Sequence, residues 1–132
     1  MNQNKIDLVM EIVSFEIAKK LKEKGFTLPK SNVIGKFDSD GVFHSQLYIN
    51  FTETMDSEEI IAPTISQVLK WLREEKGWVI VVRLYSTNGW YWFVQDEKGE
   101  LKSSHLASCD DCFSTYELAA IAGVNYCLEN LI

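Results

Sequence analysis

Two cysteines in the last third of the chain have the spacing best suited to chemistry. Cys109 and Cys112 are separated by two residues, which lets both thiolates face one tetrahedral zinc ion, and His105 and Cys127 would complete a Cys3His set. A structural zinc site normally contains a second pair at matching spacing, and this sequence has none. Cys127 also falls inside a predicted helix, on a face that suits packing against a sheet. We therefore expect Cys109 and Cys112 to be loop thiols without a permanent ligand, and we predict no cofactor.

The residue pattern gives little support to redox or acid/base catalysis. Asp110 and Asp111 stand between the two cysteines and would raise the pKa of both thiols, whereas a redox dithiol needs a lowered pKa. Neither His44 nor His105 has a nucleophile and an orienting partner in its sequence neighbourhood. The acidic run Glu53–Glu59 lacks the periodicity and central glycine of a calcium loop. We predict no catalytic residues, and a small metal- or thiol-dependent enzyme built around His105 and the cysteines stays an alternative.

A lysine-rich stretch near the N-terminus is the one candidate site for nucleic acid. The chain has a formal net charge of −6 and a pI near 4.9, so its long-range field repels phosphate backbones and anionic membrane surfaces. Cations near the end of a helix are also favoured by the helix dipole, and we expect a solvated helix face there. A nucleic-acid-binding regulator is the second functional hypothesis, and it would use Lys19, Lys20, Lys22, Lys24 and Lys30.

Length and composition indicate one packed domain that covers residues 1–132. The sequence is 46% hydrophobic and 24% charged and contains no polar linker tract. No signal-peptide core is evident at the N-terminus, and the most hydrophobic run, Trp78–Tyr85, has only the length of a strand. Three cysteines, an odd number, fit a reducing compartment better than a disulfide framework. We expect a cytoplasmic location and no membrane partner.

Capping residues, glycines and turn signals divide the chain into secondary-structure elements. Ser14 is a helix N-cap, and the pairs Thr64/Gln67 and Ser114/Glu117 are capping boxes. Asn-Gly at residues 88–89 predicts a tight hairpin turn. The elements expected, in chain order, are a helix from Ser14 to Gly25, strands Val33–Phe37 and Val42–Phe51, an acidic loop Thr52–Ile61, a helix from Thr64 to Gly77, strands Trp78–Tyr85 and Trp90–Asp96, a weak edge strand within Glu100–Ala107, and a helix from Ser114 to the C-terminus.

This order, α-β-β-α-β-β-(β)-α, predicts an α+β fold. An antiparallel sheet of about five strands in hairpins would pack on one face against three amphipathic helices. The third helix also carries a close-packing strip of Ala120, Gly123 and Cys127. The residues expected to be buried are Leu69, Leu72, Ile80, Val82, Phe93, Leu118, Ile121 and Leu128.

The hairpin around Asn88-Gly89 carries the candidate interaction surface. With a two- or a four-residue loop, alternation places Trp78, Ile80, Val82, Leu84, Tyr91 and Phe93 on one face, and Val79, Val81, Arg83, Tyr85, Trp90, Trp92 and Val94 on the other. The first set should face the helices. The second set would then expose Arg83, Tyr85, Trp90 and Trp92, a combination typical of interaction hot spots. We expect an interface there, with a second copy of the chain as a candidate partner; the alternatives are ordinary core packing and, third, a base-stacking platform.

Three stretches of the sequence carry a resemblance to a known group of proteins. They are Ser14–Phe26, Ala62–Thr64 leading to Lys70–Glu74, and Tyr116–Glu117 leading to Tyr126–Ile132. The chain resembles small uncharacterised proteins of gut Bacteroidetes and of their phages or integrated mobile elements. The resemblance implies a bacterial, cytoplasmic, mobile-element setting and assigns no activity or site residue.

The order of elements from Thr64 to Ile132 also resembles that of double-stranded-RNA-binding domains. That family places lysines at the start of its last helix to contact phosphates, whereas this chain has Ser114–Glu117 there, preceded by two aspartates. We therefore do not expect nucleic acid as a partner. The leading functional hypothesis is a non-enzymatic accessory protein of a phage or mobile element that acts through protein contacts.

Overall fold

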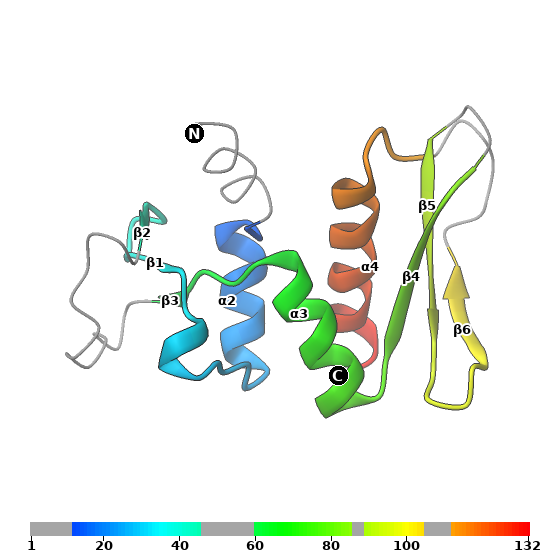
Figure 1. Ribbon diagram of the computed structural model, residues 1–132, viewed down its shortest axis with the longest axis horizontal. Coiled ribbons are helices and arrows are strands. Elements are labelled where there is room, and N and C mark those ends of the chain that lie inside the picture. The colour runs from blue at the N-terminus through cyan, green and yellow to red at the C-terminus, as the bar shows by residue number, and fades with distance from the viewer. Residues whose placement is uncertain (1–11, 46–59, 86–88, 105–111) are drawn as a thin grey trace. The chain divides into compact units, whose positions relative to one another are not determined.

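The structure is a computed structural model, and it describes residues 12–45, 60–85, 89–104 and 112–132 (Figure 1). The chain divides into two compact units, residues 1–64 and residues 65–132. Each unit has its own helix-and-sheet core and is described by itself. None of the helices in the described part of the chain is long and apolar enough to cross a membrane.

The first unit is built around helix α2, Phe15–Glu23. Ser14 caps it as predicted, because its side-chain oxygen accepts a hydrogen bond from the Ile17 amide at 3.2 Å. Ile17, Ala18 and Leu21 form its buried face, and Phe15 is half-buried against Phe37 with ring centroids 5.5 Å apart. The apolar spacing therefore identified both the helix and the side that packs inward.

A three-stranded antiparallel sheet completes the first unit. Its strands are β1 (Gly35–Phe37), β2 (Phe43–Ser45) and β3 (Ile60–Ile61), in the order β2-β1-β3, and a 3-10 turn, η1 (Lys30–Asn32), precedes β1. The sequence predicted an acidic loop through residue 61, so β3 is a correction: a two-residue strand is too short to show a period of two. The predicted continuation of the second strand, residues 46–51, lies outside the described residues.

The second unit begins with α3 (Ile65–Trp71), directly after Thr64 as expected. The helix continues as a π-helical turn, η3 (Leu72–Lys76), and ends at Gly77, whose φ of 74° is left-handed. The last helix, α4, covers Tyr116–Asn130. Its cap is Thr115, whose side-chain oxygen accepts from the Leu118 amide at 3.1 Å, so the predicted cap at Ser114 was wrong by one residue. Both residues carry the hydroxyl that a cap requires, which is why the sequence left them hard to separate.

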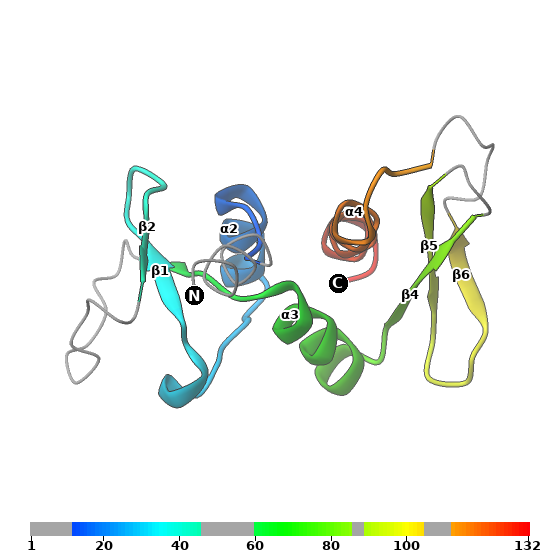
Figure 2. The ribbon, with the colours of Figure 1, turned by 45° about the horizontal axis from the view of Figure 1, so that its top comes forward.

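The sheet of the second unit contains β4 (Val79–Leu84), β5 (Trp90–Gln95) and β6 (Leu101–Ser104), all antiparallel and in that order. Helix α4 packs on β4 and β5, and α3 packs beside α4 (Figures 1 and 2). The α+β class and the predicted hairpin are confirmed. The described strands form two three-stranded sheets, where the sequence predicted one sheet of about five strands.

The register of the β4–β5 hairpin corrects the predicted faces. Leu84 pairs with Trp90, so an odd number of residues, 85–89, lies between the paired positions. The sequence instead predicted an even loop of two or four residues. Side chains that lie directly opposite share a face of the sheet. Ile80, Val82 and Leu84 therefore share a face with Trp90, Trp92 and Val94, and Val79, Val81 and Arg83 share the other with Tyr91, Phe93 and Gln95. An odd loop exchanges the two faces of β5 relative to β4.

Small side chains let α4 approach this sheet closely. The predicted strip Ala120, Gly123 and Cys127 is buried, together with Ala119, Val124 and Leu128. Of the eight predicted core residues, Leu72 and Leu128 are buried, and Leu69, Ile80, Val82, Phe93 and Ile121 are half-buried. Leu118 is 51% exposed, which corrects that prediction. Hydropathy alone predicted that Leu118 faces the sheet, whereas in the structure the alanines and the glycine of α4 make the close contact with it.

Candidate interaction surface

The face of the β4–β5–β6 sheet opposite α4 is the candidate site, and we call it the outer face. Its described positions are Val79, Val81, Arg83, Tyr85, Tyr91, Phe93, Gln95 and Leu101, assigned from the strand registers and from alternation. Helix α4 lies on the other side of the sheet, and none of the described helices of this unit covers the outer face (Figures 1 and 2). The outer face therefore combines apolar and aromatic side chains with a single charged group among its described positions, Arg83.

Three aromatic rings and one guanidinium form a continuous row on the outer face. The Tyr85 and Tyr91 centroids are 6.0 Å apart with ring planes at 84°, an edge-to-face contact. Tyr91 then stacks on Phe93, with centroids 6.2 Å apart and planes at 28°. The Arg83 guanidinium carbon lies 5.6 Å from the Phe93 centroid, within range of a cation–π interaction. Each ring is held by its neighbour, so little conformational entropy is left for a partner to remove on binding.

Both tryptophans of the predicted interaction surface lie on the helix-facing side. Trp92 is 6% exposed and packs against Tyr126 of α4, with ring centroids 5.4 Å apart. Trp90 is half-buried and meets Tyr116 at 5.6 Å, edge to face. The structure therefore separates the four predicted residues, leaving Arg83 and Tyr85 on the outer face. Tyr91 and Phe93 were not predicted to lie there. The alternation of side chains along each strand was predicted correctly, but the loop was assumed to have an even number of residues, which placed both rings on the helix-facing side.

The cysteine-and-histidine cluster is only partly within the described residues. His105 and Cys109 lie outside them, Cys112 is half-buried beside Gly89, and Cys127 is buried in α4. Burial raises the pKa of the Cys127 thiol to about 12, so this side chain stays protonated and unsuited to bind a metal. The described residues contain no group of three histidine, cysteine or acidic side chains that could hold a metal ion.

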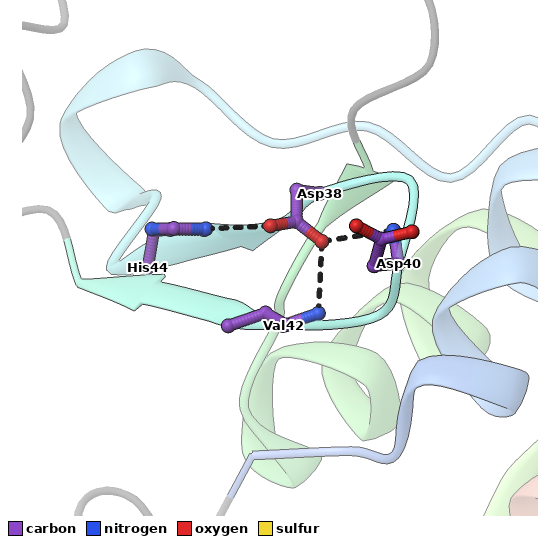
Figure 3. A network of polar contacts seen from close by, with 4 residues as sticks. All are labelled: Asp38, Asp40, Val42 and His44. Carbon is purple, nitrogen blue, oxygen red and sulfur yellow. Dashed lines mark hydrogen bonds and ion pairs between the residues drawn. The ribbon is translucent and has the colours of Figure 1, made fainter.

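His44 has one carboxylate partner, and together they close the β1–β2 turn (Figure 3). Asp38 Oδ2 lies 2.9 Å from His44 Nε2, and Asp38 Oδ1 accepts hydrogen bonds from the amides of Asp40 and Val42 at 2.9 and 3.0 Å. The His44 hydrogen bond, then those of the two amides, hold the pKa of the Asp38 carboxyl below its ordinary value. Both side chains are partly exposed at a hairpin end, and their hydrogen bonds order the turn.

The β5–β6 turn repeats this arrangement. Asp96 Oδ1 accepts from the amides of Lys98 and Glu100 at 2.9 and 3.0 Å, and Lys102 takes the place of His44 at 3.8 Å from Oδ2. Asp38 and Asp96 are each followed three residues later by a glycine at positive φ, 83° for Gly41 and 84° for Gly99. The recurrence of Asp-x-x-Gly at both turns therefore reflects one hairpin geometry, which helps to fix strand pairing.

In the lysine-rich stretch of α2, Lys19 has an acidic and an aromatic partner. Lys19 Nζ forms an ion pair with Glu16 at 3.2 Å and lies 4.9 Å from the Phe15 ring centroid. Lys22 and Lys24 are exposed on either side of Glu23. This mixture of charges matches the solvated helix face expected from the sequence.

Comparisons with protein-family models, with curated proteins and with solved structures each gave no significant match. Function is therefore inferred from the residues of this chain and their geometry. The class that fold and site define is an α+β protein whose second unit presents an aromatic sheet face.

Proposed function

We propose that the protein is a non-enzymatic binding module that holds a partner protein against the outer face of the β4–β5–β6 sheet. The observation that carries the proposal is the row Tyr85, Tyr91, Phe93 and Arg83 on the side of the sheet opposite α4. The bacterial, cytoplasmic, mobile-element setting implied by the sequence resemblance is part of the same proposal.

Sheet chemistry supports this assignment. An antiparallel sheet with a helix on one side usually turns polar side chains toward water on the other. Here the positions opposite α4 include Val79, Val81, Tyr91 and Phe93, all half-buried, and Leu101, which is 61% exposed. Tyrosine, phenylalanine and arginine are also the types enriched where proteins bind one another. A contact that covers this face removes apolar surface from water at little cost in side-chain entropy.

Charge favours a protein over a nucleic acid as partner. A base-stacking surface pairs its aromatic side chains with a basic groove, because phosphate contacts supply most of the affinity. Arg83 is the one cation among the described positions of the outer face, and the chain as a whole carries a net charge of −6. An apolar protein surface with a carboxylate opposite Arg83 is the better complement.

The test is capture of partners from a bacterial host by three purified variants beside the wild type. Tyr91→Ala and Arg83→Ala alter the outer face, and Leu118→Ala is the matched control, because Leu118 is exposed on α4. We expect a protein that binds the wild type and the control in a purified two-component assay, and that binds both face variants at least about tenfold more weakly.

Two results would contradict the proposal. Equal binding by all three variants, each checked by circular dichroism for an unchanged fold, would place the contact elsewhere. Binding of single-stranded oligonucleotides that weakens steeply with salt and disappears in Tyr91→Ala would make the face a base-stacking surface instead.

A further inference from the structure

The outward edge of β4 carries backbone groups that pair with none of the described residues. The Tyr85 amide donates to the Gly89 carbonyl at 2.6 Å, so residue 85 directs its backbone groups toward β5. In an antiparallel pair these directions alternate along the strand. Arg83, Val81 and Val79 therefore also bond to β5, whereas the amides and carbonyls of Ile80, Val82 and Leu84 point away from it.

The other side of β5 confirms this alternation. Trp90, opposite Leu84, exchanges both of its backbone hydrogen bonds with Phe113 at 2.8 Å, on the side of β5 away from β4. Asp96 likewise bonds through its amide to the Glu100 carbonyl across the β5–β6 turn. Even-numbered residues of β5 thus face β6, and odd-numbered ones face β4. Ile80, Val82 and Leu84 must face the open edge.

This edge lacks the features that protect natural sheet edges. Such edges usually carry lysine, proline, a bulge or inward-pointing charges, which prevent pairing with another strand. The sequence Val-Ile-Val-Val-Arg-Leu of β4 contains one charge and three β-branched valines, and its pairing with β5 has no register shift. Leu84, at the end of the edge, is 58% exposed. A six-residue, unprotected edge is a template for an added strand.

We propose that β4 pairs antiparallel with β4 of a second copy of the chain, joining two sheets into one continuous sheet. The proposal goes beyond the binding function above, because it uses the edge of the sheet rather than its outer face. For the helix-facing sides of the two sheets to form one side of the joined sheet, even-numbered residues of one β4 must lie opposite even-numbered residues of the other. Every register centred on a residue of the strand satisfies this condition; the centres on Val81 and Val82 pair five residues of β4, and the centre on Arg83 pairs three.

Backbone pairing and charge select the register centred on Val82. With the twofold axis at Val82, Ile80 lies opposite Leu84 of the second copy, and every edge-facing amide and carbonyl of β4 gains a partner. A centre at Val81 leaves the Leu84 groups without a partner inside the strand. A centre at Arg83 places two guanidinium groups directly opposite each other, which destabilises a strand pair.

The strand is complementary to itself in this register, which is why a second copy is the partner we assign. On the helix side, the exposed Leu84 meets Ile80 and neighbours Val82 of the other copy. On the outer side, Arg83 lies opposite Val81 of the other copy, so the two Arg83 side chains are diagonal neighbours rather than directly opposed. β-branched and aliphatic cross-strand pairs of this kind are the ones that stabilise sheets.

The expected dimer is weak and depends on concentration. One added strand pair of this length buries less than the roughly 800 Å² per partner of a stable interface. Sedimentation velocity over a concentration series should therefore show a monomer–dimer equilibrium. Leu84→Lys should weaken it by about tenfold or more, because it removes a leucine that the dimer would bury and adds a charge to the edge.

Leu101→Lys is the matched control, because Leu101 is equally exposed but lies on β6, at the opposite side of the sheet. It should dimerise like the wild type. A protein that stays monomeric throughout the series, or equal dimerisation of wild type and Leu84→Lys, would overturn the proposal. Dimerisation that is lost in Tyr91→Ala but kept in Leu84→Lys would move self-association to the outer face and also overturn it.

A cross-linking experiment tests the register itself. In a background with Cys109→Ser and Cys112→Ser, one variant carries Val81→Cys and another carries Arg83→Cys. The register places these positions opposite each other as a non-hydrogen-bonded pair with Cα atoms about 4.5 Å apart, within the range of a disulfide. Mild oxidation of the mixture should give a mixed disulfide dimer in clear excess over the products of either variant alone. Equal yields from mixture and single variants would exclude this register.

Discussion

The rings of Trp92 and Tyr126 lie with centroids 5.4 Å apart and planes tilted by 41°, which fixes the central strand β5 against helix α4. Gly123, one helical turn before Tyr126, lies beside the same indole ring: a Cβ there would be in ordinary van der Waals contact with the ring at 3.5 Å, and closer, at 2.9 Å, to Ile80 Cγ2. A tryptophan of the sheet and the glycine of the helix thus lie at one contact. This pairing determines which face of the sheet is covered, and hence that Tyr91 and Phe93 lie on the opposite face.

Leu72 should contribute strongly to the stability of the second unit. Its side chain is fully buried where the helix changes to a π-helical turn, so Leu72→Ala leaves a cavity and should cost about 2–5 kcal/mol of unfolding free energy. Leu118→Ala is the control and should cost less than about 0.5 kcal/mol, because the side chain is largely exposed. Urea denaturation followed by tryptophan fluorescence measures both. Equal losses would show that burial does not rank these two leucines.

Gly123→Ala should destabilise the protein although alanine is the better helix former. Replacing glycine gains about 1 kcal/mol of helix propensity. The new Cβ would lie 2.9 Å from Cγ2 of Ile80, a stiff β-branched side chain, and overpacking of this kind costs about 1–3 kcal/mol. In an Ile80→Ala background the clashing atom is gone, so the same substitution should become neutral or stabilising. A double-mutant cycle measured by thermal unfolding would refute this explanation if the two effects simply added.

The β1–β2 hairpin should lose stability in acid through Asp38. The folded-state pKa of this carboxyl is lowered from 3.8, first by the His44 hydrogen bond and then by the Val42 amide. A lowered pKa stabilises the folded state above the unfolded value, and the contribution disappears as pH falls through the folded pKa. The stability difference between wild type and Asp38→Asn should thus be constant above about pH 5 and shrink below pH 3.8.

Asp40→Asn is the matched control for this acid effect. Asp40 lies in the same turn and contributes its backbone amide, not its carboxylate, to the network. Its stability difference from the wild type should change little over the same pH range. Carboxyl NMR shifts of Asp38 would settle the cause directly, since an ordinary titration midpoint for this residue would remove the basis of the prediction.

Helix caps, helix ends and hairpins could be predicted from the sequence, whereas the way in which the elements pair could not. The Ser14 cap, the end of the second helix at Gly77 and both hairpins follow from side chains that act within a few residues. The faces of the β4–β5 hairpin depend instead on whether residues 85–89 form an odd or an even loop, and Asn-Gly favoured the even one. One residue of loop length was enough to exchange Trp92 for Phe93 on the candidate surface.

Helix α4 shows the same limit for packing. Its leucines predicted a buried stripe through Leu118, but close approach to the sheet selects Ala119, Ala120 and Gly123. That preference exists only when the sheet is present, because an isolated helix gains nothing from a small residue at a contact. The edge of β4 is also invisible to sequence patterns, since strand order decides which strand is outermost.

Cys127 should be inert to thiol reagents in the folded protein, whereas Cys112 should react. Burial raises the pKa of the Cys127 thiol to about 12, so almost no thiolate forms near neutral pH, and the side chain is also shielded by the helix–sheet contact. Cys112 is only half-buried and keeps a path to solvent. Iodoacetamide labelling at pH 8 with peptide mass spectrometry should modify Cys112 well before Cys127, and both equally in denaturant. The raised pKa also stabilises the fold below the ordinary thiol value of 9.0, a contribution lost as pH rises toward 12, so Cys127→Ala should flatten the alkaline decline in stability. Equal labelling of the two thiols in the native protein would show that Cys127 is not held in the core.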